Sequence, residues 1–374
     1  MYTAAFASLF TINMGIKTGE RILVFSDMIR PEEQPSADDA DRRKRLLETA
    51  AAAAAFAKKT YGNTTFVSFP ATAASGAEPP QEVWRAALGD NTVNRLAVAG
   101  ILQRLLSKTA SVEDLDLAKQ TVIAGKDAVT EIIIALANNS TSHTRFRSLA
   151  TAAGARFASL PHFDPEMFLT SMQVDWPALA ERTRRLAAAV NLASTLEVTT
   201  PNGTRMLMGK EGRTAEGDDG LLTTPGSFGN LPAGEVYLAP VEGMSEGQMV
   251  LEYAPTRKLD TPLVLTVKGG KVVDIEGEDA HRKQLEKKFA ESVNNRNIAE
   301  LGIGTNDRAK RPDNILEAEK ILGTIHIALG DNSGFGGTVS TPFHEDYVFY
   351  KPTLTAILPN GTRKVLLTEG KSVL

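Results

Sequence analysis

Histidines and acidic residues between positions 235 and 346 are the side chains whose types and spacing could support metal chemistry. The 374-residue chain contains no cysteine, which excludes disulfides, thiolate metal ligands and cysteine nucleophiles. Any imidazole chemistry must therefore draw on five histidines: His143, His162, His281, His326 and His344.

Two of these histidines lie in segments with the pattern of strands. His326 is part of the apolar, glycine-bounded stretch 323–330, and in a strand its side chain points away from its two isoleucine neighbours. His344 and Asp346 open the stretch 344–350, where they would share one face about 6.5–7 Å apart at the backbone, with Glu345 on the other face. An imidazole and a carboxylate in this relation can bind one metal ion.

Two glutamates could complete such a site. Glu235 follows a glycine-rich turn and opens a short strand at 236–239, and Glu300 precedes the glycine-containing segment 301–304. Two imidazoles and three carboxylates form a nitrogen and oxygen donor set that suits zinc, cobalt, manganese or iron. The candidate metal ligands are Glu235, Glu300, His326, His344 and Asp346.

Two other motifs have simpler explanations. Residues 243–247 (Gly-Met-Ser-Glu-Gly) match a serine-hydrolase pattern, but that motif needs a helix after the serine, and a strand pattern follows here, so we expect a plain turn. His143 opens a predicted helix that Ser142 could cap, and the free N–H groups of that helix could hold a carboxylate or phosphate. A structural role is favoured for His143 over contact with a substrate.

The elements that must position these residues change character along the chain. In the first half, apolar runs predict strands at 20–27, 64–69, 128–135 and 155–160. Helical periods lie between them, at 2–14, 38–59, 80–88, 91–106, 112–120 and 143–154. Strands that alternate with helices predict an α/β domain with an open, mostly parallel sheet.

After a long predicted helix at 175–193, the second half consists mainly of short apolar runs and glycine turns. Pro-Asn-Gly-Thr at 201–204 and 359–362, and Gly-Gly at 269–270, each separate two such runs and predict three hairpins. We therefore expect a domain boundary near residue 195. The α/β N-terminal domain would span 1–195, and a mainly antiparallel α+β domain that binds the metal would span 196–374.

Composition excludes several classes of protein. With 41 basic and 45 acidic residues the net charge is −4, which argues against a general nucleic-acid-binding protein. No segment approaches the roughly 18 uninterrupted apolar residues of a membrane span, and the first residues lack the pattern of a signal peptide. We expect a cytoplasmic protein without a membrane or nucleic-acid partner.

Six segments resemble the M29 metallo-aminopeptidases, the aminopeptidase T group. In the second half they are 229–240 (GNLPAGEVYLAP), 299–304 (AELGIG), 323–330 (GTIHIALG) and 343–346 (FHED). In the first half they are 19–24 (GERILV) and 78–84 (EPPQEVW). The resemblance spans nearly the whole chain and is specific in its C-terminal motifs. It implies a bimetallic exopeptidase, usually a homodimer, with an enclosed active site.

The activity implied by this resemblance is the removal of N-terminal residues from peptides. Two divalent ions (zinc, cobalt or manganese) would be bound by the five candidate ligands, with Glu300 bridging them, and would activate a water for attack on the peptide carbonyl. Glu300 and Asp346 would be the catalytic carboxylates. Glu345 and Glu319 are spare candidates for proton transfer.

The chain also departs from the M29 pattern. The family's active-site tyrosine follows the histidine strand, whereas the equivalent segment 331–337 (DNSGFGG) has none; Tyr347 or Tyr350 could replace it in space. Distant relatives of the same fold include an iron dioxygenase that opens dihydroxypyridine rings. The alternative is therefore a one-iron site of His326, His344 and Asp346, in which Glu235 and Glu300 would have no ligand role. A third possibility is a non-catalytic relative.

Overall fold

The computed structural model describes residues 2–255 and 257–373. The chain forms two compact units, and it passes between them three times. The first unit comprises Met1–Trp176 and Gly220–Pro232, and the second comprises Pro177–Asp219 and Ala233–Leu374. A single boundary near residue 195 was expected. The division differs because the end of the long helix α8 (Trp176–Asn191) packs into the core of the second unit, and because residues 228–230 add a strand to the first.

The first unit is built on a parallel five-stranded sheet with the order β2-β1-β3-β4-β8. Residues 132–135 (Ile-Ile-Ile-Ala) form an unbroken apolar run and are buried, and residues 156–159 (Arg-Phe-Ala-Ser) beside them are also buried throughout. This confirms the α/β class. The strands are β1 (Ile22–Met28), β2 (Thr64–Pro70), β3 (Ile132–Ala135), β4 (Arg156–Ser159) and β8 (Phe228–Asn230).

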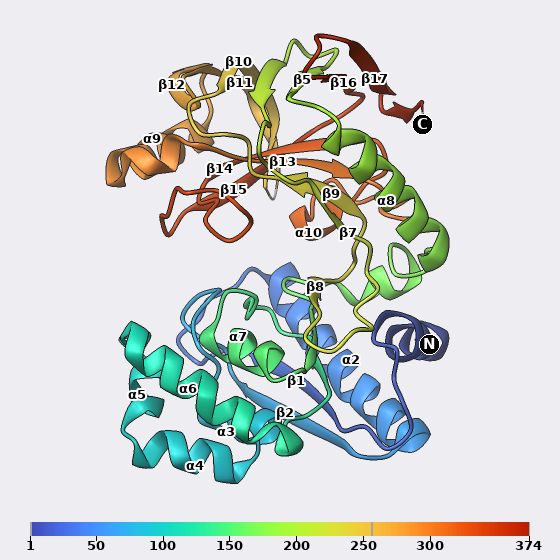
Figure 1. Ribbon diagram of the computed structural model, residues 1–374, viewed down its shortest axis with the longest axis vertical. Coiled ribbons are helices and arrows are strands. Elements are labelled where there is room, and N and C mark those ends of the chain that lie inside the picture. The colour runs from blue at the N-terminus through green and yellow to red at the C-terminus, as the bar shows by residue number, and fades with distance from the viewer. Residues whose placement is uncertain (1, 256, 374) are drawn as a thin grey trace. The chain divides into compact units, whose positions relative to one another are not determined.

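Helices cover both faces of this sheet (Figure 1). The long helix α2 packs on one face, whereas Leu23 and Phe25 of β1 point into the other face, a core shared with helices α3 to α7. The predicted helix 91–106 is wrong as a single element, because Gly100 adopts a left-handed conformation (φ 69°) and separates α4 from α5. The α-helices are α1 (Thr3–Ser8), α2 (Ala37–Tyr61), α3 (Gln81–Leu88), α4 (Asp90–Val98), α5 (Ile101–Leu106), α6 (Val112–Ala124) and α7 (Arg145–Ala152). A π-helix spans Leu9–Asn13, and 3₁₀ turns span Lys126–Ala128 and Pro165–Leu169.

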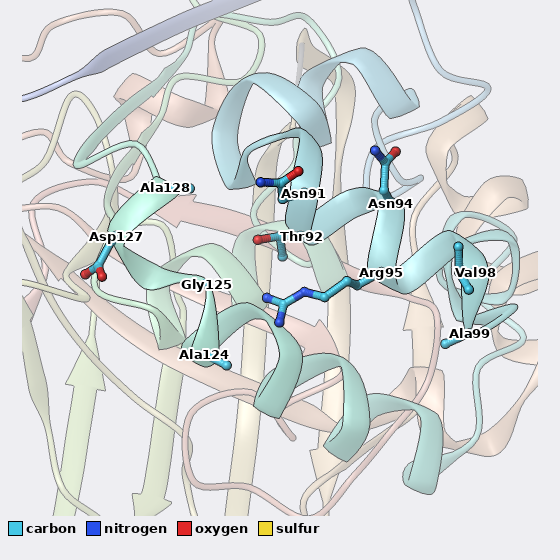
Figure 2. A pocket seen from close by; sticks show the side chains of 10 residues that line it. All are labelled: Asn91, Thr92, Asn94, Arg95, Val98, Ala99, Ala124, Gly125, Asp127 and Ala128. Atoms are coloured by element: carbon cyan, nitrogen blue, oxygen red, sulfur yellow. The ribbon is translucent and has the colours of Figure 1, made fainter.

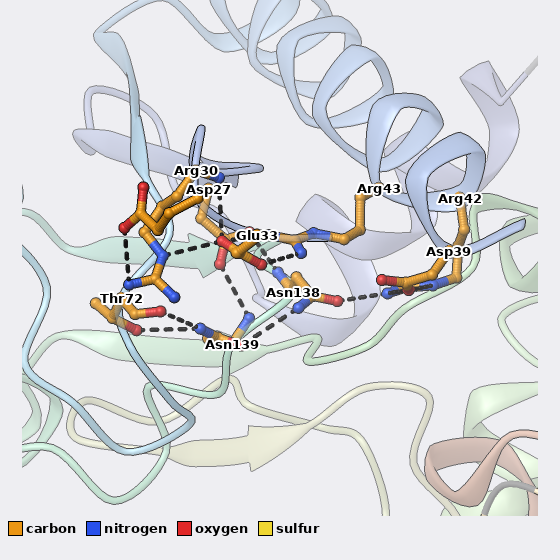
Figure 3. Close-up of polar contacts among 10 residues, drawn as sticks. Asp27, Arg30, Glu33, Asp39, Arg42, Arg43, Thr72, Asn138 and Asn139 are labelled. Carbon is orange, nitrogen blue, oxygen red and sulfur yellow. Dashed lines mark hydrogen bonds and ion pairs between the residues drawn. The ribbon is translucent and has the colours of Figure 1, made fainter. Parts of the chain in front are cut away.

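One buried carboxylate joins the loops at the carboxyl ends of the parallel strands. Asp27 accepts hydrogen bonds from the backbone N–H groups of Asn138 (2.6 Å) and Asn139 (3.0 Å), which follow β3 (Figure 3). The side-chain amide of Asn139 in turn donates to the backbone carbonyl of Thr72, which follows β2 (2.7 Å). Ligands of open α/β sheets commonly bind at this edge. Here its polar groups bond to one another.

The second unit consists of two antiparallel sheets. The first, with order β12-β11-β10-β6-β5-β16-β17-β18, contains all three predicted hairpins as β5–β6, β11–β12 and β16–β17. Its strands are β5 (Thr195–Thr199), β6 (Arg205–Gly209), β10 (Ser245–Ala254), β11 (Arg257–Lys268), β12 (Lys271–Glu276), β16 (Thr353–Ile357), β17 (Arg363–Thr368) and β18 (Lys371–Ser372).

The second antiparallel sheet, with order β15-β14-β13-β9-β7, contains every candidate metal ligand. Its strands are β7 (Glu216–Asp218), β9 (Glu235–Leu238), β13 (Ile298–Gly304), β14 (Ile325–Gly330) and β15 (His344–Phe349). The unit also contains α8, α9 (Ala280–Glu291), a 3₁₀ turn at Val293–Arg296 and α10 (Ile315–Ala318). In the described residues, no helix is long and apolar enough to cross a membrane.

Period-two alternation gives this second sheet one apolar and one polar face. Alternate residues of β9, β13, β14 and β15, such as Val236, Leu301 and Ile327, belong to a core that also includes residues of the eight-stranded sheet. The intervening residues point to the opposite face. The five candidate ligands are among these intervening residues, so the fold directs all of them to the same side.

Candidate metal centre

Strand pairing brings the five predicted ligands together. His326, the central member, lies with its Nε2 atom 3.4 Å from Glu235 Oε2 and 3.4 Å from Glu300 Oε1. The second histidine, His344, has its Nε2 atom 3.4 Å from Glu300 Oε2 and 3.6 Å from Asp346 Oδ2. The geometry is that of a compact set of ligands on one sheet face.

Three overlapping groups of ligand atoms each lie within 4.8 Å of one another. They are Glu235–Glu300–His326, Glu300–His344–Asp346 and Glu319–His326–Asp346. The spare candidate Glu319 therefore joins the set, whereas Glu345 does not. We call these six residues the ligand cluster.

Glycines on β13 make room for this cluster. Gly302 pairs with His326 across the β13–β14 ladder, and a Cβ atom at Gly302 would lie 1.9 Å from the Nε2 atom of that ring. A Cβ atom at Gly304 would lie 2.1 Å from the carbonyl oxygen of Ile321. The glycines at 302 and 304 are thus required by close packing, and Gly302 in particular by the imidazole that lies over it.

The cluster holds an excess of negative charge. Burial would raise the pKa of Glu300, but hydrogen bonds from His326 and His344 outweigh it and hold that pKa well below its usual range. Burial alone would lower the pKa of His326, but its contact with Glu300 and the other carboxylates nearby raise it to about 9. Burial and neighbouring carboxylates raise the pKa of Glu319 to about 7, although Lys320 opposes them.

The donor atoms fit a bound metal cation. Two buried oxygens, Oε2 of Glu235 and Oδ1 of Asp346, accept no hydrogen bond from the described residues. Buried carboxylate oxygens are normally hydrogen-bonded or bound to a cation. An imidazole and carboxylate set of this kind can bind zinc, cobalt, manganese or iron.

The sequence does not predict one residue beside the ligand cluster, a buried lysine. Lys320, the second residue after α10, is 1% exposed, and its Nζ atom lies 2.5 Å from Glu235 Oε1 and 2.7 Å from Glu319 Oε1. In sequence it follows two glutamates on a charged segment, a pattern that usually indicates a solvated surface. Only the sheet and the turn after α10 reveal that it is buried against the ligands.

Neither tyrosine proposed as a replacement for the M29 tyrosine reaches the cluster. Tyr347 points to the apolar face of the sheet, where its hydroxyl hydrogen-bonds to Glu345 and lies 2.8 Å from Nε2 of His281. Tyr350 packs its ring on Tyr253. His281 therefore makes a buried polar contact with Tyr347 in the core.

The remaining sequence candidates lie elsewhere. Ser245 begins β10 after a turn, as expected, and no helix follows it. Thr144, not Ser142, caps α7, and the first backbone N–H groups of that helix bind the carboxylate of Glu78 at 2.6 and 3.0 Å. The expected anion at the start of α7 is thus a side chain of the protein itself, and His143 precedes the cap.

A surface hollow of about 820 Å³ in the first unit is unrelated to the ligand cluster (Figure 2). It lies between α4 and the end of α6, and Arg95 and Asp127 are its charged lining residues. The ten residues that line it include no histidine. All six cluster residues belong to the second unit.

The second unit of this fold carries a buried carboxylate and imidazole cluster whose ligand atoms could hold a metal ion. The chain belongs to the NicX family, described as 2,5-dihydroxypyridine 5,6-dioxygenase, whose sequence model matches residues 83–356. That stretch includes all six cluster residues. A search of curated proteins finds no match.

Two solved structures share the fold over the whole chain. A 2,5-dihydroxypyridine dioxygenase from Pseudomonas putida is 17% identical, with a TM-score of 0.69 over 100% of this chain and 96% of that one. AmpT from Thermus thermophilus is 15% identical, with a TM-score of 0.61 over 100% and 99%. The M29 resemblance therefore holds for the fold, while the family assignment is NicX.

Proposed function

We propose that the protein is a mononuclear iron dioxygenase that opens a dihydroxylated nitrogen-containing aromatic ring. His326, His344 and Asp346 would bind the iron, as the two-histidine, one-carboxylate set used by non-haem iron oxygenases. Asp346 links the two histidines, because it shares one ligand group with His326 and another with His344. The observation that carries this proposal is the NicX family match, which covers every residue of the ligand cluster.

In a one-iron site, Glu235, Glu300 and Glu319 would not be ligands of the metal. Each of these carboxylates has another partner in the structure. Glu235 and Glu319 are paired with the Lys320 ammonium. Glu300 lies between the two imidazoles, 3.4 Å from each, and orients both. The six-residue cluster is therefore compatible with a single metal ion.

When bound, iron would supply the redox chemistry that joins dioxygen to the aromatic ring. The chain itself would orient the two imidazoles through Glu300 and keep His326 shielded from water, since that side chain is 1% exposed. His344 is the most exposed member, with a side chain 33% accessible, so substrate would approach the cluster from its side.

Oxygen consumption tests this proposal directly. The protein would be loaded anaerobically with ferrous iron and mixed with 2,5-dihydroxypyridine in an oxygen-electrode cell. We expect about one dioxygen consumed per ring opened, with activity lost after chelation and restored by iron but not zinc. Ring opening at an unchanged rate after verified removal of iron would contradict the proposal.

A metallo-aminopeptidase is the second candidate, because Glu300 belongs to two of the three ligand groups and could bridge two ions. One ion would then bind the free amine of a peptide substrate. Cobalt-, manganese- or zinc-loaded protein should release residues from free peptides far faster than from N-acetylated ones. Equal rates on both substrates would exclude an aminopeptidase.

We also propose a homodimer, in keeping with the M29 resemblance. Analytical ultracentrifugation at micromolar concentration would show a mass of about twice 40.1 kDa for a dimer.

A further inference from the structure

A buried ammonium group is paired with one carboxylate in each of two of the three ligand groups. Lys320 contacts Glu235, a member of the group with Glu300 and His326, and Glu319, a member of the group with His326 and Asp346. The third group, Glu300–His344–Asp346, has no such contact with Lys320 among the described ion pairs.

The position of this lysine is set by the backbone. Its N–H donates to the carbonyl of Glu317 (3.0 Å) at the end of α10, and its carbonyl accepts from the N–H of Asn306 (2.8 Å). These bonds fix the main chain of Lys320, and its side chain, 1% exposed and paired with two carboxylates, is enclosed by the protein. Its charge stays beside the ligands.

An ammonium group paired with a carboxylate weakens the attraction of that carboxylate for a divalent ion. The Nζ atom lies 2.5 Å from Oε1 of Glu235, so a metal ion bound to either oxygen of this carboxylate would lie close to the ammonium, where like charges repel. Burying two cations side by side is unfavourable unless anions outnumber them.

Formal charges point the same way. The cluster has four carboxylates (Glu235, Glu300, Glu319 and Asp346), a formal charge of −4. Lys320 brings this charge to −3, and one divalent ion brings it to −1. A second divalent ion would make the buried site positive, whereas without the lysine two divalent ions would neutralise it.

We infer that Lys320 is a built-in cation that takes the place of a second metal ion and restricts the centre to one. This inference rests on the proposed one-metal function. It adds that removal of the ammonium turns the same cluster into a two-metal site, with Glu235 as a ligand of the added ion.

Cobalt binding to the intact protein provides the test. Wild type and Lys320→Met would be stripped of metal, dialysed to equilibrium against cobalt chloride, and analysed for cobalt per chain. We expect about one ion in wild type and about two in Lys320→Met, because methionine keeps the length of the side chain but not its charge. Lys320→Arg, which keeps the charge, should bind about one ion.

Two further variants locate the effect. Lys210→Met removes another buried lysine of the same unit, whose Nζ donates to the carbonyl of Arg213, and should bind as wild type does. Lys320→Met combined with Glu235→Gln should return to one ion, since the ligand of the second ion is lost. Thermal unfolding of each variant shows whether it is folded before its metal is counted.

The outcomes separate this inference from the proposed function. One ion in both wild type and folded Lys320→Met overturns the inference, while oxygen uptake on the wild-type iron protein still decides the function. Two ions in wild type overturn the inference at once, even where Lys320→Met does not fold. One ion rising to two supports it, whatever substrate is turned over.

Discussion

Asp346, like Glu300 and His326, is a central member of the ligand cluster. It belongs to two of the three ligand groups, and its Oδ1 atom is buried without a hydrogen-bond donor among the described residues. Asp346→Asn keeps the shape but removes the charge, so metal affinity should fall, and kcat should drop by at least ~100-fold, equivalent to about 2.7 kcal/mol of barrier. Steady-state kinetics and metal analysis on the same preparation measure both.

Glu345 is the matched control for this substitution. It neighbours Asp346 in sequence but points to the opposite face, where it meets the hydroxyl of Tyr347. Glu345→Gln should leave the metal content and the rate near wild type. If Glu345→Gln lost the metal while Asp346→Asn kept it, both the strand register and the ligand assignment would be wrong.

Gly302 offers an independent test of the site, because a side chain at this backbone position would displace the His326 ring. An alanine methyl group there would overlap the His326 ring, at 1.9 Å from Nε2, and the ring would have to leave the carboxylates. We expect Gly302→Ala to weaken metal binding by about 10–100-fold or more, as measured by competition with a metal indicator. Gly334→Ala is the control, because a methyl group there meets nothing within 4 Å.

Among single residues, the candidate ligands that could be predicted from the sequence are those whose side-chain direction follows from the two-residue period of a strand. His344, Asp346 and His326 follow from period-two patterns within short segments, and their convergence needs only that the strands pair. Lys320 could not be found, because its burial depends on the contact between the turn after α10 and β9. Tyr347 is wrong as a replacement for the M29 tyrosine. The same alternation that groups His344 with Asp346 directs Tyr347 to the other face of the sheet.

At the level of elements, an ion pair connects α2 to the loop before it. Arg43, a buried residue of α2, lies 2.5 Å from Glu33, and Arg30 also contacts that carboxylate (Figure 3). The hydrogen bond from Arg43 is the main cause that lowers the pKa of Glu33 from 4.5 to about 2.

This ion pair makes part of the stability of the fold dependent on pH. A carboxylate whose pKa is lower in the folded state binds fewer protons there, so its contribution is present above pH 4.5 and is lost as the pH falls towards about 2. Glu33→Gln should destabilise the protein by about 1–3 kcal/mol at neutral pH and change little at pH 2. Urea unfolding at several pH values measures this, and a constant difference across the range would contradict it.

The elements that could be predicted are those with a local signal. The three hairpins have turns whose Asn-Gly or Gly-Gly residues favour them, and β1 and β3 each contain a continuous apolar run. Strand β8 (Phe-Gly-Asn) was missed because three residues with a central glycine have no periodicity. It becomes a strand only through pairing with β4.

For the whole molecule, metal binding should stabilise the second unit and leave the stability of the first unit unchanged. The ligands lie on β9, β13, β14 and β15 and next to α10, all in the second unit, whereas the sheet of β1 to β4 belongs to the first. Binding at about 100 times the dissociation constant adds about 2.7 kcal/mol to the state that holds the ion. Hydrogen exchange should therefore slow in β13 to β15 on metal addition and stay unchanged in β1 to β4.

The passage of β8 into the first unit has a consequence for how the protein is made. The first unit needs residues 220–232 to complete its parallel sheet, and residues 177–219, which precede them, belong to the second unit. During translation the ribosome thus delivers part of the later unit before the earlier one has its last strand. Nascent chains stalled when residues 156–159 have left the exit tunnel, but residues 228–230 have not, should expose the β4 edge. Protection of that edge should appear only once residue 230 has left the tunnel.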